Sequence, residues 1–410
     1  MQKISALNLS DIRKICIFGT GMTATAVRNK LSEFPEYQEV SPQAKPDLGI
    51  ISPGLVTEEY RKKYSFPIIS EIEWAYLLFK HLGKLPFFIA ISGTNGKTTT
   101  THLVADLLDI PMAGNVGIPL INYVSKNLTE IPVSFSLEMS SYQIEQSPAF
   151  TPDIYILMTI TEDHLDRHKT MDNYANVKMS LAERQSENQA FIYNGADEWI
   201  VKKVKKLKNK KVRLIDFTRG RKMFAKELAA SPLLGKHNED NLLAALSAAA
   251  LVKKKSYVQK VKKIKKIPHR LEPVGIVKNI EFINDSKATN PDSTIAALKS
   301  INVKRMILLL GGQKKQASYE PMFELIRKGR IRVLTFGEAR EFFNENLRSV
   351  GLVLASKPTM KEAVKTAFKK AADRDIIVLS PGCASFDEFH NFEERGNVFR
   401  KLVSGLSAEK

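Results

Sequence analysis

Short apolar runs alternate with amphipathic stretches along most of the chain, and this alternation predicts its architecture. Residues 87–91 are five apolar residues in succession, as expected of a buried strand. Downstream, apolar side chains recur at helical spacing, at positions 103, 104, 107 and 108. Beyond residue 268, strand-like and helix-like segments alternate up to "DIIVLSPG". Such alternation is typical of a mostly parallel sheet covered by helices, so we predict an α/β fold.

Three segments can be separated along the 410 residues of the chain. The first, residues 1–85, contains an apolar run and then the glycine turn "GTGMTA" at 19–24, a common pattern that brings backbone N–H groups near a diphosphate. Residues 86–267 form the second segment and residues 268–410 the third. We predict three domains: a short Rossmann-like N-terminal domain, a central P-loop ATPase-type domain with a mostly parallel sheet, and a C-terminal Rossmann-like domain.

The formal charge of +18 comes from 62 basic and 44 acidic residues, and the lysines are concentrated in two runs, 201–211 and 253–266. Nucleic-acid binding is one interpretation of such a surplus. In the second run, however, Val258, Val261 and Ile264 recur every three residues, which predicts a solvated lysine face over a buried stripe. No aromatic-rich binding module accompanies the charge, so we expect no nucleic-acid partner.

The remaining composition narrows the class of protein. Apolar residues make up 43% of the chain, which excludes a disordered protein, and no apolar run is long enough to span a membrane. The first residues do not resemble a secretion signal, so we expect a cytoplasmic protein without a membrane partner. Cys16 and Cys383 lie far apart in apolar surroundings. We expect two buried thiols rather than a disulfide or a metal site.

The stretch "ISGTNGKTTT", residues 91–100, is the strongest single motif. It has the Gly-Lys-Thr ending of a phosphate-binding loop but carries Ile91 where the common pattern has its first glycine. It lies between a predicted strand and a predicted helix, which is the context that a phosphate loop requires. Lys97 could then reach the β- and γ-phosphates and Thr98 could bind Mg²⁺. The alternative interpretation is a polar helix start that is rich in threonine.

Two further segments could hold a metal. Glu138 follows an apolar strand, where a carboxylate beside a phosphate loop would suit Mg²⁺, although an ordinary surface glutamate is equally compatible with the pattern. The segment "TEDHLDRH", residues 161–168, gathers acids and histidines after another strand. It predicts either a metal-adjacent cluster or a helix start capped by Thr161, because acids are favoured in a first helical turn.

Several long motifs resemble those of the Mur ligase family. "SGTNGKTTT", "LEMSSYQIE", "TEDHLDRH", "YANVKMSL", "PHRLE", "NDSKATN" and "SPGCASFDEFHNFEERG" occur in that family's order, from about residue 85 to the end. "NDSKATN" and "SPGCASFDEF" are similar to the member that adds D-glutamate. The resemblance implies a monomeric cytoplasmic enzyme of peptidoglycan precursor synthesis. Such an enzyme uses ATP and two Mg²⁺ ions to join D-glutamate to UDP-N-acetylmuramoyl-L-alanine through an acyl phosphate.

The resemblance also implies roles for individual residues. ATP contacts fall on Gly93, Thr94, Asn95, Gly96, Lys97, Thr98, Thr99, Asn241, Arg270 and Asp285. Metal ligands fall on Thr98, Glu138, His164 and Lys178, and Lys178 matches the lysine that the family carbamoylates, which turns a cation into a carboxylate-like ligand. The catalytic groups would be Lys97, His164, Lys178 and Lys287. Substrate contacts fall on Asn115, Thr289, Lys315, Ser385, Phe386 and Phe392, joined by Thr23 from the glycine turn.

Two departures from the family leave questions open. Residues 25–49 are fewer than the family usually has there, and Ser41 stands about where an acid near the uridine is expected. The loop "GGQKK" leaves open whether Lys314 or Lys315 meets D-glutamate. Two alternatives therefore stand beside the main prediction. One is a sister Mur or folylpolyglutamate-type amide ligase, and the other is an inactive nucleic-acid-binding paralogue.

Overall fold

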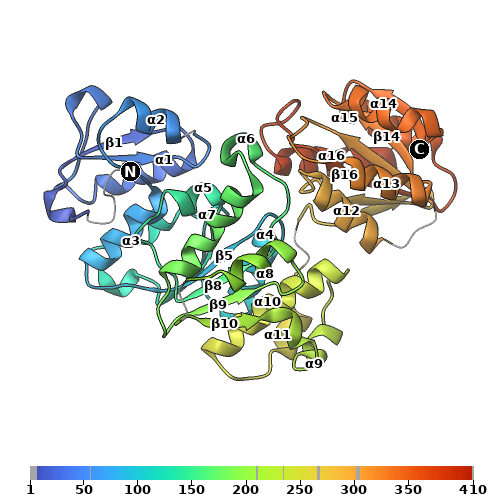
Figure 1. The fold of residues 1–410 in the computed structure, drawn as a ribbon. Coiled ribbons are helices and arrows are strands. Elements are labelled where there is room, and N and C mark those ends of the chain that lie inside the picture. Colours follow the sequence, from blue (N-terminus) through green and yellow to red (C-terminus); the bar gives the residue numbers. More distant parts are fainter. Residues whose placement is uncertain are drawn as a thin grey trace. The chain divides into compact units, whose positions relative to one another are not determined.

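The fold is described from a computed structural model, which describes residues 7–55, 57–208, 211–233, 235–265, 268–301 and 305–408. These residues form three sheets with helices between the strands, so the predicted α/β class is confirmed (Figure 1). The chain divides into two compact units. Unit 1 comprises residues 1–160, 167–231 and 238–264, and unit 2 comprises residues 161–166, 232–237 and 265–410.

Unit 1 contains two sheets, of which the first is small. Its four parallel strands have the order β2-β1-β3-β4 and are β1 (Lys14–Phe18), β2 (Gln38–Glu39), β3 (Leu48–Ile51) and β4 (Ile68–Ser70). The accompanying helices are α1 (Met22–Leu31), α2 (Thr57–Lys63) and α3 (Glu71–His81). This is the short Rossmann-like segment that the sequence predicts.

Helix α3 joins the first sheet of unit 1 to the second through two buried acids in its first turn. Glu71 accepts a hydrogen bond from the backbone N–H of Ile121, and Glu73 accepts from those of Ala149 and Phe150. Burial raises the pKa of each carboxyl to about 7, against the opposing effect of these N–H donors. The two sheets therefore share buried polar contacts as well as an apolar core.

The second sheet of unit 1 has six parallel strands in the order β10-β9-β8-β5-β7-β6. They are β5 (Phe87–Ser92), β6 (Met112–Gly114), β7 (Ser134–Glu138), β8 (Ile154–Leu157), β9 (Ala190–Tyr193) and β10 (Arg213–Asp216). The helices that follow them are α4 (Lys97–Leu108), α5 (Ser141–Glu145), α7 (Met171–Arg184), α8 (Glu198–Lys205), α9 (Ala225–Ala229), α10 (Lys236–Val252) and α11 (Val258–Lys262). The short α6 (Leu165–His168) precedes α7.

The apolar pattern explains why β5 is central. Four of the five residues of the predicted strand are buried, and β5 pairs with β7 on one side and β8 on the other. Helix α4 buries Leu103, Val104 and Leu107 as its spacing predicts. Because the strands are parallel, the ends of β5, β7 and β8 place their following loops at one edge of the sheet.

Unit 2 contains the third sheet, with the order β11-β12-β16-β13-β14-β15. Its strands are β11 (Glu272–Val277), β12 (Ile280–Asn284), β13 (Met306–Gly311), β14 (Arg332–Phe336), β15 (Val353–Lys357) and β16 (Ile376–Gly382). Its helices are α12 (Pro291–Ser300), α13 (Glu320–Gly329), α14 (Arg340–Leu347), α15 (Met360–Lys370) and α16 (Phe392–Ala408). Among the described strands of this sheet, β11 alone is antiparallel, pairing with β12 as a hairpin at the edge, and the sequence patterns did not predict this strand.

Several smaller predictions can be compared with the structure. Cys16 and Cys383 are buried free thiols, as predicted. Val261 and Ile264 are buried and Val258 is half-buried, while Lys262, Lys263 and Lys265 are exposed, so the predicted stripe is confirmed at two of its three positions. Residues 209 and 210 of the first run and the predicted domain boundary at 267 lie outside the described residues. Within the described part of the chain, no helix is long and apolar enough to cross a membrane.

Candidate functional site

The loop between β5 and α4 depends on two glycines. Gly93 has φ +149°, and a Cβ there would lie 3.0 Å from the backbone nitrogen of Thr159. Gly96 has φ +86° and directly precedes α4, and a Cβ there would lie 2.6 Å from Oδ1 of Asn241. L side chains rarely adopt such conformations, so both positions require glycine. Ile91 lies within β5, so the missing first glycine of the common pattern is part of a strand.

Backbone contacts hold the loop against the end of β8. The N–H of Thr94 donates to the backbone carbonyl of Thr159 at 2.7 Å, and the N–H of Asn95 donates to the side-chain hydroxyl of Thr159 at 3.0 Å. These two N–H groups are therefore engaged within the protein. The donors that a helix leaves without internal partners lie instead in the first turn of α4, which begins at Lys97. An anion at this loop would meet the positive end of that helix.

Two lysines converge on one carbonyl of the loop. Lys97 Nζ donates to the carbonyl oxygens of Gly93, at 2.8 Å, and Thr94, at 2.7 Å. Lys178 Nζ also donates to the carbonyl of Gly93, at 3.2 Å, and to the hydroxyl of Ser92, at 3.2 Å. The two ammonium groups concentrate positive charge where a phosphate loop receives its anion.

Lys178 is not the exposed helical lysine that its sequence pattern alone would indicate. It lies on α7 and is only 1% exposed. Its ammonium lies 4.7 Å from the centre of the Tyr174 ring, and the Tyr155 hydroxyl donates to its backbone carbonyl at 2.9 Å. Helix α7 therefore directs this side chain to the loop, where a carbamate on Nζ would add oxygen ligands for a metal.

Glu138 is buried at the end of β7, directly beside β5. It pairs with Ile91 and Gly114, and its Oε1 accepts a hydrogen bond from Asn115 Nδ2 at 2.9 Å. Its Oε2 is buried and has no hydrogen-bond partner among the described residues. A buried carboxylate oxygen without a donor is costly unless a cation or ligand meets it. The interpretation of Glu138 as an ordinary surface residue is therefore wrong, and its chemistry fits Mg²⁺.

The structure gathers most of the unit 1 candidates around the loop. These are residues 93–99, Asn115, Glu138, Lys178 and Asn241, whose Oδ1 accepts a hydrogen bond from the Thr100 hydroxyl. Within the described residues, no group of three or more His, Cys, Asp and Glu side chains could hold a metal without other ligands. Magnesium in nucleotide sites does not need one, because phosphates and waters complete its shell.

Thr23 lies in the first turn of α1, which accompanies the first sheet of unit 1. It is half-buried near the start of α1, just after the turn at Gly19, whose φ is +118°. A Cβ on Gly19 would lie 2.4 Å from Ser52 Oγ, so the glycine turn and the segment after β3 meet closely. This geometry places Ser52 beside the glycine turn that the sequence predicts to lie near a diphosphate.

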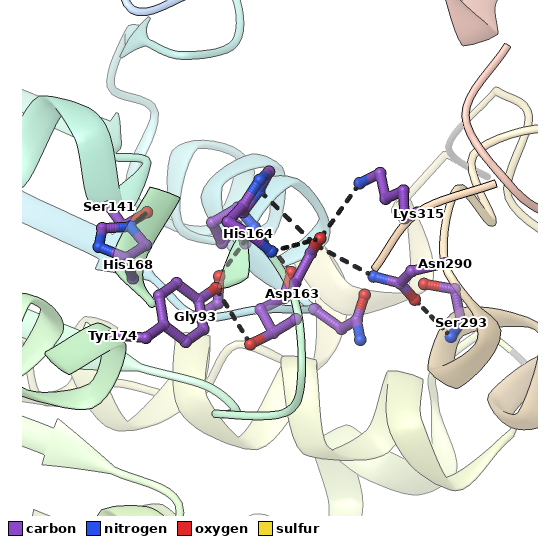
Figure 2. Close-up of polar contacts among 12 residues, drawn as sticks. Gly93, Ser141, Asp163, His164, His168, Tyr174, Asn290, Ser293 and Lys315 are labelled. Carbon is purple, nitrogen blue, oxygen red and sulfur yellow. Dashed lines mark hydrogen bonds and ion pairs between the residues drawn. The ribbon is translucent and has the colours of Figure 1, made fainter. Parts of the chain in front are cut away.

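In unit 2, Asp163 connects two candidate residues, His164 and Lys315, with Asn290, which the sequence patterns did not single out (Figure 2). Its carboxylate lies 3.3 Å from Lys315 Nζ, 3.6 Å from His164 Nε2 and 3.5 Å from Asn290 Nδ2. His164 adopts φ +56°, and its backbone N–H donates to Asp163 Oδ1 at 3.0 Å. In the sequence, Asp163 stood out only as a member of the acidic segment. Its position shortly after the apolar run at 154–160, where a strand ends, was the signal that could have singled it out.

The interpretation of Thr161 as a helix cap is wrong. Helix α6 begins at Leu165, four residues further on, and is only one turn long. Burial raises the pKa of the Asp292 carboxyl, and nearby Thr161 partly offsets this effect. Asp292 lies in the first turn of α12, so this part of the acidic segment lies close to α12 within unit 2.

A second group in unit 2 forms around Asp285, at the end of β12. Asp285 accepts hydrogen bonds from the Ser380 hydroxyl at 2.8 Å and from the Leu271 N–H at 3.2 Å. Burial raises the pKa of its carboxyl to about 6, although the charge of nearby Arg270 opposes this. Burial and the same arginine lower the pKa of His237 to about 4. The sequence patterns did not single out His237.

Arg270 offers an unused donor beside this acid. Its Nε is buried and has no hydrogen-bond partner among the described residues. Asp285 and Arg270 thus place an acceptor and a donor together at the carboxyl end of parallel strands, the edge where α/β sheets bind ligands. Both residues are among the predicted ATP contacts.

The remaining unit 2 candidates lie on neighbouring loops. Lys287 Nζ lies 5.1 Å from the centre of the Phe392 ring, and the Thr289 N–H donates to the carbonyl of Lys287. Ser385 is buried whereas Phe386 is 68% exposed. Gln313 and Ala384 form a two-way backbone bridge, which brings the "GGQKK" loop to the segment that carries Ser385.

Two neighbouring lysines in that loop have different contacts. Lys315 forms the ion pair with Asp163, whereas Lys314 Nζ lies 4.0 Å from the centre of the Phe342 ring. Arg395, which the sequence analysis did not nominate, is fully buried and donates to the carbonyls of Cys383, Ala384 and Ser286. It acts as a positioning residue that holds the Ser385 loop against the segment after β12.

Comparisons with known proteins agree with this division into a phosphate-loop unit and a second α/β unit. Residues 91–230 match the Mur ligase middle domain, and residues 269–383 match the Mur ligase glutamate ligase domain. The UDP-N-acetylmuramoylalanine–D-glutamate ligase of Koribacter versatilis is 35% identical over 393 residues, which cover 89% of this chain and 84% of that protein. The enzyme of the same name from Elusimicrobium minutum is 36% identical, with coverage of 88% and 86%.

Solved structures show the same fold at lower sequence identity. The MurF ligase of Thermotoga maritima in complex with ADP has a TM-score of 0.63, with 13% identity and coverage of 98% of this chain and 97% of that chain. A pseudomurein peptide ligase type C from Methanothermus fervidus has a TM-score of 0.60, with 14% identity and coverage of 96% and 100%. The fold and the phosphate loop together define a class of protein, the nucleotide-using α/β proteins, here with three sheets. The family matches are specific, and the chain belongs to the Mur ligase family.

Proposed function

We propose that this protein is the ATP-dependent ligase that joins D-glutamate to UDP-N-acetylmuramoyl-L-alanine in peptidoglycan precursor synthesis. The observation that carries the proposal is the group around the loop after β5. There, Lys97 and Lys178 converge on the Gly93 carbonyl, and the partnerless Oε2 of Glu138 lies at the end of the adjacent strand. The relatives named above carry this activity in their names, and the chain covers most of their length.

The reaction activates a carboxylate and then replaces phosphate by an amine. The substrate carboxylate attacks the γ-phosphorus of ATP, and ADP leaves, which gives an acyl phosphate. The amine of D-glutamate attacks the acyl carbon, and the tetrahedral intermediate expels phosphate as the amide forms and the amine loses a proton. Because negative charge accumulates at one centre, the protein contributes chiefly positioning and positive charge.

Unit 1 supplies the groups that meet the phosphates. In our proposal Lys97 releases the loop carbonyls and binds the β- and γ-phosphate oxygens, while the first turn of α4 directs its N–H groups at the same anion. Thr98, Glu138 and a carbamoylated Lys178 would hold Mg²⁺, and His164 of unit 2 is assigned to the second ion. When bound, the ions neutralise charge on the transferring phosphoryl group.

Unit 2 supplies groups for the nucleoside and for the incoming amino acid. Asp285 in its ionised form is a strong acceptor for ribose hydroxyls, and Arg270 is a further proposed ATP contact, as is Asn241 of unit 1. Lys287 is assigned to the developing negative charge. D-Glutamate carries two carboxylates, which need cations and hydrogen-bond donors. Lys315, Thr289 and Ser385 are the groups we assign to them, with Phe386 and Phe392 as apolar contacts.

The remaining assignments follow from the activity. Asn115 and Thr23 are assigned to the UDP-linked substrate. We place the enzyme in the cytoplasm, because the reaction consumes ATP, and we propose that it acts as a monomer, because one chain carries every group assigned above.

A product assay tests the proposal. The purified protein is incubated with UDP-N-acetylmuramoyl-L-alanine, ATP, Mg²⁺ and D-glutamate, and the product mass and ADP release are measured. Formation of the D-glutamyl amide is expected. ADP release with L-lysine or meso-diaminopimelate but not with D-glutamate would instead indicate a sister ligase. Salt-sensitive RNA binding without ATP turnover would indicate a nucleic-acid-binding paralogue.

A further inference from the structure

A cavity in unit 1 lies away from the phosphate loop, between β10, the turn that follows it, α9 and α10. Its volume is about 640 Å³, which is within the range of small-molecule sites. Small residues on two facing elements leave this space: Gly220 in the turn, and Ser247 and Ala250 on α10. None of the groups assigned to the ligase reaction lines it.

The interior of this cavity is apolar. Ile215, Met223, Phe224 and Leu251 line it. Phe224 is buried, whereas Met223 is 76% exposed, so one wall is a flexible apolar side chain that solvent can reach. A Cβ on Gly220 would lie 3.3 Å from the Phe224 ring, so the glycine provides part of the room. An apolar body of a ligand could therefore replace water here.

The rim of the cavity is positively charged. Arg213, Arg219, Lys254 and Lys255 line it together with two acids. Both acids already have partners within the protein. Asp216 accepts from the N–H groups of Gly195 and Thr218 and pairs with Arg219, while Glu227 accepts from the Ser256 hydroxyl and the Tyr257 N–H.

The other cations of the rim differ from Arg219. Lys255 lies over the Tyr257 ring, whereas the side chains of Arg213 and Lys254 form no hydrogen bond, ion pair or ring contact with any described residue. The charge that this rim offers to a ligand is thus positive. An apolar interior below unpaired cations matches a molecule with an apolar body and an anionic head.

We propose that this cavity is a second ligand site, for a small amphipathic carboxylate with an aromatic or alkyl body. Such a ligand places its apolar part against Phe224 and Leu251 and its carboxylate between Arg213 and Lys254. The site is separate from the nucleotide site, because Asn241 at the phosphate loop and Ala250 at the cavity are nine residues apart on α10. That spacing corresponds to about 13 Å along the helix axis.

The test uses 2-naphthoate as the carboxylate probe and 2-naphthamide as its neutral counterpart. Binding to the full-length protein is measured by isothermal titration calorimetry in the presence of saturating Mg²⁺-ATP, which keeps the phosphate loop filled. We expect one naphthoate site per chain and naphthamide binding at least fivefold weaker. A second titration without Mg²⁺-ATP should give the same naphthoate affinity. Naphthoate binding that is seen only without Mg²⁺-ATP, or equal affinity for the two probes, would overturn the proposal.

Variants locate the bound probe. Ala250→Trp fills the cavity and is expected to weaken naphthoate binding at least tenfold, with ATP affinity unchanged as the check on folding. The surface variant Arg213→Glu/Lys254→Glu does not disturb the interior. It is expected to weaken naphthoate at least fivefold and naphthamide less than twofold. Lys262→Glu, an exposed lysine that does not line the cavity, is the matched control. Unchanged naphthoate binding in Arg213→Glu/Lys254→Glu would contradict the site.

Discussion

The phosphate loop of unit 1 and the Asp285 group of unit 2 occupy equivalent positions, each at the carboxyl ends of parallel strands, but their chemistry is opposite. At the loop, two ammonium groups and the start of a helix present donors and positive charge. At the end of β12, a buried carboxyl with a raised pKa presents an acceptor that Arg270 keeps closer to ionisation. The same architecture thus provides a site for phosphates in one unit and a site suited to hydroxyls in the other.

The largest effect is expected from the loop lysine. Lys97→Ala removes the ammonium that we assign to the β- and γ-phosphates, so the rate of ADP formation should fall about 10³-fold. Steady-state ADP release checks this, with circular dichroism to confirm folding. Lys206→Ala, an exposed lysine at the end of α8, is the control and should keep full activity. If Lys97→Ala lowers the rate of ADP formation less than tenfold, Lys97 does not have the role in phosphoryl transfer that we assign to it.

Lys178→Ala tests the carbamate. We expect about a 10²-fold loss of activity, because a metal ligand is missing, and partial recovery when a small carboxylate such as formate is added. Mass spectrometry of the intact wild-type protein at high bicarbonate should show the added carbamate. Full activity in Lys178→Ala would contradict the carbamate hypothesis. Loss of activity that formate does not restore would instead indicate that Lys178 contributes by packing beside Tyr174.

The two neighbouring lysines of unit 2 allow a matched pair of variants. Lys315→Ala should raise KM for D-glutamate about 30-fold with little change in KM for ATP, because a charge-assisted contact is lost. Lys314→Ala, which removes only the contact with the Phe342 ring, should change either constant less than twofold. The reverse pattern would move the assignment to Lys314.

The smallest effect is expected at Asp285. Asp285→Asn should raise KM for ATP about tenfold at pH 8 and remove the dependence of that KM on pH near 6, where protonation of the wild-type carboxyl weakens its acceptor role. A tenfold change corresponds to about 1.4 kcal/mol. If wild type and Asp285→Asn show the same pH profile, Asp285 does not contact the nucleotide.

The same carboxyl also predicts a pH dependence of stability. Its pKa is about 6 in the folded protein and near 3.8 in the unfolded chain, so the folded state binds more protons between these values. The free energy of unfolding should therefore fall as the pH rises from about 4 to 6, by at most about 3 kcal/mol. The free energy of unfolding, measured by urea titration at each pH across this range, should depend less on pH in Asp285→Asn than in the wild type.

The sequence predicted the sheets well because β5, β13 and β16 are continuous apolar runs between polar loops. It also predicted the phosphate loop, since its glycines and lysine are adjacent in the chain. The antiparallel β11 was missed because "EPVGIV" contains proline and glycine, and its residues are only partly buried. Long-range partners could not be predicted from local patterns. Arg395 donates to Ser286, which lies 109 residues away in the sequence. The burial and the nearby Arg270 that lower the pKa of His237 likewise arise only from tertiary packing.

The two acids at the start of α3 bear on how the molecule can be divided. Glu71 and Glu73 accept hydrogen bonds from the backbone N–H groups of Ile121, Ala149 and Phe150, which lie in segments that connect strands of the second sheet, so removing the first segment would take away the acceptors of these donors. The small N-terminal sheet is consequently not a detachable module. In a chimera, the segment from a relative would have to provide acceptors at the positions of Glu71 and Glu73. Without them, the backbone N–H groups at the contact between the two parts would lose their hydrogen-bond partners.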